Sequence, residues 1–237
     1  MLKKILFLVA LLLAQAAAAA EPAAKPAGDI TLLTGRATAA GESGEIRSLE
    51  KGGTVYPGEM INTGPNSYLN IKFTDGGRVL LRPNSRFQIE EYAFTEAAGP
   101  GQSRSAGASP NVDAEPEGNA LFRLLKGGFR AVTGLIGEKN RDNYKVRTPV
   151  ATIGIRGTDF EARFCQGDCL DIDPAPRDGL YTGVFNGGIQ LSNSAGTFDR
   201  DAGQYGFVPG FSAPAVGLKR RPRALAQDPM PDPEACD

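Results

Sequence analysis

Short runs in which apolar and polar residues alternate constrain this chain most. Leu69, Ile71 and Phe73 fall on one face of a strand, and the residues between them are polar. Asp75-Gly76 follows, a favoured two-residue hairpin turn because both positions tolerate positive φ. Similar runs recur roughly every ten residues through the first half of the chain. The sequence therefore predicts an all-β fold, which its 30 glycines and 17 prolines also favour.

The stretch from residue 144 to residue 164, YKVRTPVATIGIRGTDFEARF, joins two strand patterns. From Thr158 onward apolar and charged residues alternate, which is typical of a half-buried strand. In the first half, the alternating pattern moves from even-numbered to odd-numbered positions near Gly154 and back to even-numbered positions near Gly157. Glycine often marks a bulge or corner, because it turns without steric cost. Pro149 is expected to hold the residue before it extended. The stretch therefore predicts a strand, a kinked corner at GIRGT and a second strand.

Arg156 lies between the two glycines of this corner, and three roles fit it. Its five guanidinium donors can clamp the corner by bonding to nearby backbone carbonyls. Alternatively, the side chain points into water, or it binds a ligand. The sequence leaves these three roles open.

The run TPVATIGIRGTDF closely resembles the core signature of the FecR-type domain, a family named after the periplasmic regulator of ferric citrate uptake. Residues 56–92 also look like this family, with a Gly-Glu before an Ile-x-Thr, then Phe-x-Asp-Gly and Pro-x-Ser. The resemblance covers roughly residues 28–208. It implies a structural role for the signature residues, which are Thr148, Pro149, Gly154, Arg156, Gly157, Thr158 and Phe160.

The resemblance also implies a function. FecR-like regulators receive a signal from an outer-membrane transporter and pass it through a membrane helix to a cytoplasmic anti-sigma segment. We expect this chain to lack both the helix and the anti-sigma segment. The implied function is a non-catalytic exported module for binding, sensing or signalling in the cell envelope, whose partner is an envelope protein or a cell-wall component. The alternative is a structural protein that docks other envelope components.

The resemblance favours a β-solenoid-like stack of short hairpins. An irregular β-sandwich stays open because alternation alone does not decide between the two. We predict a β domain over residues 28–208, preceded by a flexible start over 21–27. A disordered insert is predicted over 95–118 and a disordered proline-rich tail over 209–237, because both segments lack apolar periodicity.

Residues 1–20 have the pattern of a secretory signal peptide. Two lysines precede an apolar run from Ile5 to Leu13, and the small residues that end at Ala20 form a cleavage site. The apolar run is too short to span a bilayer. The sequence therefore predicts export to the periplasm, or secretion, with no integral membrane segment after cleavage.

Composition argues against two classes of function. The chain contains no histidine, which removes the commonest general base and transition-metal ligand, so we expect no enzyme and no cofactor. Removing the leader takes two lysines from 26 basic residues, so 24 basic residues face 27 acidic ones, a net charge of −3. A nucleic acid partner is not expected, because it would favour a basic surface.

Cys165 and Cys169 lie close together in an exported chain, which favours a disulfide. The C-x₃-C spacing differs from the C-x₂-C of thioredoxin-like sites. A redox pair, a metal site and two reduced thiols are the alternatives, and Cys236 is expected to stay free.

An acidic loop follows the first of these cysteines. Carboxylates could hold calcium, but the spacing is not that of an EF-hand loop, so we interpret the segment as a solvated acidic turn and predict no metal site. The acids are Asp168, Asp171, Asp173 and Asp178.

Residues 120–136 are ambiguous. Leu121, Leu124 and Leu125 have helical spacing, whereas the glycine pair and the β-branched residues that follow favour a strand. The family resemblance implies a strand that enters a turn, and a short amphipathic helix is the alternative.

Overall fold

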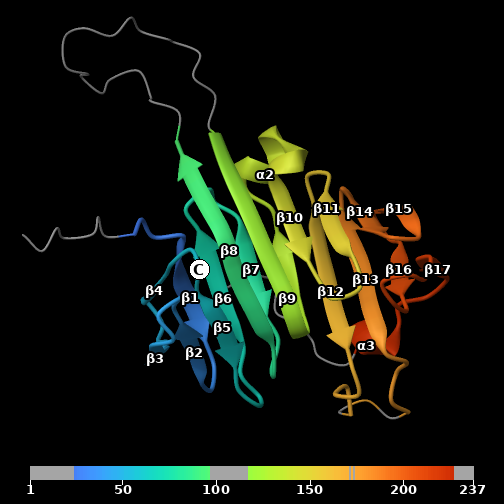
Figure 1. Ribbon diagram of the computed structural model, residues 1–237, viewed down its shortest axis with the longest axis horizontal. Helices are drawn as coiled ribbons and strands as arrows, with labels where there is room; N and C mark the ends of the chain where they lie inside the picture. The colour runs from blue at the N-terminus through green and yellow to red at the C-terminus, as the bar shows by residue number, and fades with distance from the viewer. Residues whose placement is uncertain (1–23, 97–116, 171, 173, 227–237) are drawn as a thin grey trace, which may run out of the picture.

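The computed structural model describes residues 24–96, 117–170, 172 and 174–226, and these form two β-sheets that share one long strand (Figure 1). The first sheet has the order β4 (Thr54–Val55), β1 (Gly28–Leu33), β6 (Leu69–Phe73), β7 (Arg78–Leu81), β9 (Glu117–Val132), β12 (Asp159–Cys165), β13 (Gly179–Asn186), β16 (Tyr205–Val208) and β17 (Val216–Leu218).

The second sheet contains the shared strand β9 at its centre. Its order is β3 (Ile46–Ser48), β2 (Ala37–Ala40), β5 (Met60–Thr63), β8 (Arg86–Thr95), β9, β10 (Tyr144–Arg147), β11 (Thr152–Ile155), β14 (Gly188–Asn193) and β15 (Gly196–Asp201). Three short helical segments complete the described part: α2 (Leu135–Lys139), η1 (Arg141–Asn143) and α3 (Arg223–Ala226).

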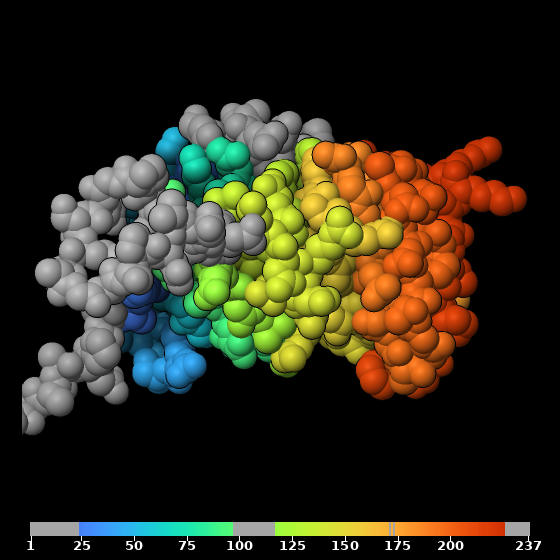
Figure 2. Space-filling view, turned by 90° about the horizontal axis from the view of Figure 1, so that it is seen from above, coloured from blue at the N-terminus to red at the C-terminus, as the bar shows by residue number. Residues whose placement is uncertain are grey.

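In both sheets the strand order follows the chain closely. The strands therefore advance along the long axis of the molecule, as the colour gradient in Figures 1 and 2 shows. The β9–β10 pair is parallel, and the other pairings among the described residues are antiparallel. The all-β prediction is confirmed, and the stepwise advance fits the predicted solenoid-like stack of hairpins.

Strand β9 connects the two sheets. Its first half pairs with β8 and β10 in the second sheet, and its second half pairs with β7 and β12 in the first. The strand changes sheets at Gly127, whose φ of +76° suits glycine. A Cβ there would lie 2.4 Å from Oγ of Ser85, so no larger residue fits. That hydroxyl also accepts a hydrogen bond from the backbone N–H of Gly128 at 3.0 Å, which fixes the bend.

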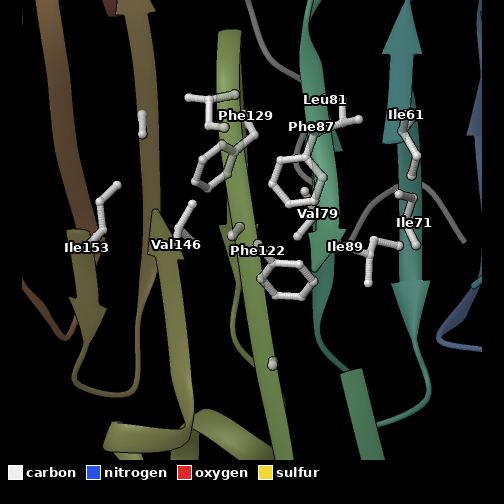
Figure 3. Close-up of a cluster of buried hydrophobic side chains, with 14 of the residues drawn as sticks. Ile61, Ile71, Val79, Leu81, Phe87, Ile89, Phe122, Phe129, Val146 and Ile153 are labelled. Atoms are coloured by element: carbon white, nitrogen blue, oxygen red, sulfur yellow. The ribbon is translucent and has the colours of Figure 1, made fainter. Parts of the chain in front are cut away.

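Aromatic side chains from both sheets form the core between them (Figure 3). Phe122 in the first half of β9 lies 5.1 Å from Phe73 and 5.4 Å from Phe87, between ring centroids. Phe129 in the second half contacts Phe87 at 5.7 Å and Phe160 at 5.5 Å. Offset and edge-to-face pairs of this kind stabilise a core beyond the area that they bury. The two layers are therefore held together by one continuous aromatic row.

The segment around Pro149 differs from the prediction. Thr148 follows the last residue of β10 and begins a hairpin turn, in which its hydroxyl accepts the N–H of Ala151 at 3.1 Å and donates to the carbonyl of the same residue at 2.7 Å. The turn joins β10 to β11, so the change of parity lies here and not at Gly154. Gly154 lies in register within β11, and a Cβ there would meet no atom closer than 3.9 Å.

Strand β12 is buried on both faces, so the prediction of a half-buried strand is wrong. Phe160 and Ala162 face the core between the sheets. On the other face, Glu161 is 0% exposed and Arg163 is 8% exposed. These charged residues are covered by the C-terminal segment that contains α3: Arg163 donates to the carbonyl of Ala224 at 3.4 Å.

The ambiguous segment at residues 120–136 is mainly a strand. Residues up to Val132 belong to β9, so the strand prediction is confirmed there and the helix alternative is wrong. Helix α2 begins only at Leu135. Ile136 in this helix is 3% exposed and packs into the core.

Several predicted boundaries are corrected by the structure. Residues 209–226 are not a disordered tail, because β17 pairs with β16 and Leu225 is completely buried. Ala27, assigned to the flexible start, is 0% exposed, and its N–H donates to the carbonyl of Val55 at 2.9 Å. The ends of the predicted insert belong to strands β8 and β9. The signal peptide, the interior of the insert at 97–116 and the last eleven residues, 227–237, lie outside the described residues.

Candidate interaction site

The Arg-Gly-Thr corner between β11 and β12 is held together by Thr158. Its hydroxyl donates to the carbonyl of Gly188 at 2.6 Å and accepts the N–H of Arg156 at 3.0 Å. Its own N–H donates to the hydroxyl of Thr133 at 2.9 Å. Gly157 takes a φ of +62°, the left-handed conformation that favours glycine. The corner is therefore a hydrogen-bonded junction between three separate segments.

Arg156 does not clamp this corner through carbonyls, as one interpretation of the sequence expected. Its Nη2 donates to Oδ1 of Asp201 at 2.6 Å. The two side chains are 37% and 65% exposed, so the pair lies at the surface. The Arg156 guanidinium lies directly over Gly188, because a Cβ added to that glycine would be 2.6 Å from Nη2 of Arg156. The side chain thus covers the junction, while the hydroxyl of Thr158 holds it.

The signature residues do not gather at one point. Arg156, Gly157 and Thr158 meet the turn between β13 and β14, whereas Thr148 and Pro149 lie at the opposite end of β11. Phe160 belongs to the core. The signature therefore fixes the fold at several places and forms no catalytic cluster among the described residues.

Two surface hollows adjoin at Leu125 in β9, shortly before the bend at Gly127. The first has a volume of about 360 Å³ and the second about 350 Å³. The first is lined by Arg123, Leu125, Arg147, Thr148, Pro149 and Thr152. The second is lined by Arg86, Leu125, Lys126, Phe164, Gln166 and Asp168. Because each lining contains two cationic side chains, we call this pair of cavities the basic hollows.

Two acids partly neutralise the basic hollows. Glu90 pairs with Arg123 and, at 3.4 Å, with Nη1 of Arg147. Lys126 Nζ lies 3.7 Å from Oδ2 of Asp168. Four cations therefore face two acids, and the hollows keep a net positive charge.

The two predicted disulfide residues lie beside the second hollow. The sulfur atoms of Cys165 and Cys169 are 2.09 Å apart, which is disulfide distance. The pair is buried in a small second core together with Tyr181, Phe207 and Leu225. The cysteine pair therefore fastens the loop after β12 to the C-terminal segment.

The acidic loop itself is folded by its carboxylates. Asp168 accepts the N–H of Gln166 at 2.8 Å, and Asp178 accepts the N–H of Gly167 at 2.7 Å. Asp171 and Asp173 lie outside the described residues. Within the described ranges, no three side chains of the His, Cys, Asp and Glu types gather as metal ligands would.

A buried ion cluster links the first sheet to the C-terminal segment, and no local sequence pattern predicted it. Arg82 Nη2 lies 3.0 Å from Oε2 of Glu161, and Arg221 Nη2 lies 2.8 Å from Oε1. The side chains of Arg82 and Glu161 are 2% and 1% exposed. Burial raises the pKa of the Glu161 carboxyl, and the two guanidiniums offset only part of that increase.

Residues 59–170 match the family model described as FecR protein. This part of the chain is therefore a FecR-type domain, which confirms the resemblance carried by the signature. Helices in the described part of the chain are too short and too polar to span a membrane.

Some solved structures resemble this chain in part. Two crystal structures of a “putative anti-sigma factor” from Parabacteroides distasonis ATCC 8503 are similar at 12% identity and a TM-score of 0.44, over 67% of this chain and 58% of that chain. This chain thus spans 58% of that protein's length. A “Cell surface anchoring domain” has 32% identity and a TM-score of 0.26, over 26% of this chain and 82% of that one. No curated protein matches the sequence.

Proposed function

We propose that this chain is a non-catalytic exported module that binds a partner in the cell envelope and takes part in sensing or signalling. The FecR-type domain at residues 59–170 carries the proposal. Its signature residues support it further, because Thr158 and Gly157 are engaged in holding the corner, and Phe160 fills the core. A domain whose signature maintains the fold acts through its surface.

Periplasmic location is part of the same proposal. The leader over residues 1–20 has the pattern of an export signal. Cys165 and Cys169 lie at disulfide distance, and disulfides persist in oxidising compartments. The partner is then an envelope protein or a cell-wall component.

In-cell crosslinking followed by purification of the exported chain tests the proposal. We expect one envelope protein to be captured reproducibly, at a yield that increases with the level of the exported chain. Capture of peptidoglycan alone, or of a multi-component structural assembly, would favour the docking role instead. A chain that stays in the cytoplasm would contradict both.

A further inference from the structure

We propose that the basic hollows bind an extended acidic segment of the partner protein. This inference rests on the proposed function and specifies where the partner binds and what chemistry it presents. The hollows lie where strands β8, β9 and β10 meet the turn between β10 and β11 and the end of β12 with the loop that follows it.

The cations around Leu125 are accessible to a partner. The side chains of Arg123, Lys126 and Arg147 are 41%, 52% and 51% exposed, whereas Glu90 is only 13% exposed. Glu90 therefore lies beneath the two guanidiniums. Each guanidinium has five donors, so one contact with Glu90 leaves further donors for a ligand. Planar guanidiniums bind carboxylates with two parallel hydrogen bonds, so an acidic side chain is a suitable ligand.

The positions of these cations suit an extended chain. Arg123 and Arg147 are in register on neighbouring parallel strands, and Arg86 pairs with Lys126 across the antiparallel side. Neighbouring strands lie about 4.8 Å apart, and alternate residues of one strand about 6.8 Å apart. Arg123 and Lys126 are three residues apart in β9, about 10 Å along the strand, and an extended peptide with acids about 6.8 Å apart, at every second position, spans this distance. Such a peptide can reach both hollows and place an apolar side chain on Leu125 between them.

Shape and charge argue against other partners. The molecule as a whole carries a formal net charge of −1, which does not suit a nucleic acid. The apolar part of the site is confined to the lining of two concave hollows and includes Leu125, Phe164 and Pro149. A membrane surface instead needs a protruding apolar face with surrounding cations.

The test measures binding of a fluorescein-labelled peptide, Glu-Ser-Glu-Leu-Glu-Ser-Glu, to the mature exported chain by fluorescence anisotropy. We expect saturable binding that weakens as salt is added, since exposed charges are screened. The double variant Lys126→Ser/Arg147→Ser should bind about tenfold more weakly or worse, because it loses two charge-assisted contacts. The peptide with Gln in place of Glu should bind neither protein.

The matched control is Lys25→Ser/Lys51→Ser, which removes the same charge from two exposed positions away from the hollows. Its affinity should stay within about twofold of the wild type. Urea unfolding of all three proteins checks that the fold is retained. Equal loss in both double variants would mean that net charge alone attracts the peptide, and would overturn the inference. Binding of phosphatidylglycerol vesicles or inorganic phosphate with higher affinity than the peptide would overturn it as well.

The envelope crosslinking experiment separates this inference from the proposed function. If Lys126→Ser/Arg147→Ser still captures the same envelope protein as the wild type, the hollows are not the docking site, while the proposed function stands. If the wild type captures no envelope partner, the proposed function itself fails. Loss of capture in this variant alone supports both.

Discussion

Replacing Glu161 by Gln should destabilise the fold strongly. The substitution keeps the size of the side chain but removes the carboxylate that faces Arg82, whose side chain is 2% exposed. Removing one partner of a buried ion pair typically costs about 3–5 kcal/mol, because the remaining charge is desolvated without this counter-charge. Arg221→Gln should cost only about 1 kcal/mol, because Arg221 is 40% exposed and water can replace part of its contact.

Urea unfolding at pH 8, followed by tyrosine fluorescence, measures both effects. With an m-value of about 2 kcal/mol/M, the Glu161→Gln midpoint should fall by about 1.5–2.5 M. The matched control is Glu50→Gln at an exposed position, which should stay within about 0.5 kcal/mol of the wild type. The double variant Arg82→Met/Glu161→Met should cost less than Glu161→Gln, because it removes both charges. If Glu161→Gln and the control unfold at the same urea concentration, the claim that the ion cluster stabilises the attachment of the C-terminal segment is refuted.

Three further predictions concern other residues. Thr158→Val should lower the free energy of unfolding by about 1–3 kcal/mol, because it removes a buried hydroxyl that makes two hydrogen bonds. Arg156→Lys should lower it by only about 0–1 kcal/mol, because the pair of Arg156 with Asp201 is exposed. Urea midpoints compare the two, and the reverse order would contradict the corner described above. Peptide mapping without reduction should recover Cys165 linked to Cys169, a loop worth about 2 kcal/mol, with Cys236 free; a linked Cys236 would sink this assignment. Burial raises the pKa of the Tyr144 phenol in the folded state, so the stability that this residue contributes is present below about pH 10 and is lost as the pH rises above it. Unfolding curves at pH 8 and pH 11 measure this loss of stability. The loss should be smaller in Tyr144→Phe than in the wild type.

The alternation of residues predicted the strands because one face of most strands packs against the core. Leu69, Ile71 and Phe73 are buried as their spacing indicated, with Asp75-Gly76 at the turn. The change from even-numbered to odd-numbered buried positions in the signature is also present in the structure, but a hairpin turn at Pro149 causes it. Local patterns identify a change of direction without deciding which residue makes it.

Long-range contacts explain what the sequence did not predict. Arg82 bonds with Glu161, 79 residues away, and with the carbonyl of Leu225, 143 residues away. The C-terminal segment is rich in Pro, Ala and charge, a composition typical of mobile tails. Its described residues are nevertheless folded onto the domain, because its few apolar residues pack on the buried disulfide pair. A charge on a strand normally faces solvent, so nothing local marks Glu161 as buried.

The role of the Arg156 side chain could not be derived from spacing either. Its partner Asp201 lies 45 residues further along the chain, and only the fold brings the two together. The same holds for the basic hollows, where Arg86, Lys126 and Arg147 come from three different strands. No sequence motif connects these cations.

Site-specific photo-crosslinking in living cells tests the central claim most directly. A photo-reactive side chain is introduced at Pro149, on the exposed rim of the first hollow, and in a separate variant at the exposed Lys51. We predict a discrete crosslink from position 149 to one envelope protein, through an acidic segment of that protein, and none from position 51. Equal crosslinks from both positions, or none from position 149 while the exported chain is folded and abundant, would contradict the account.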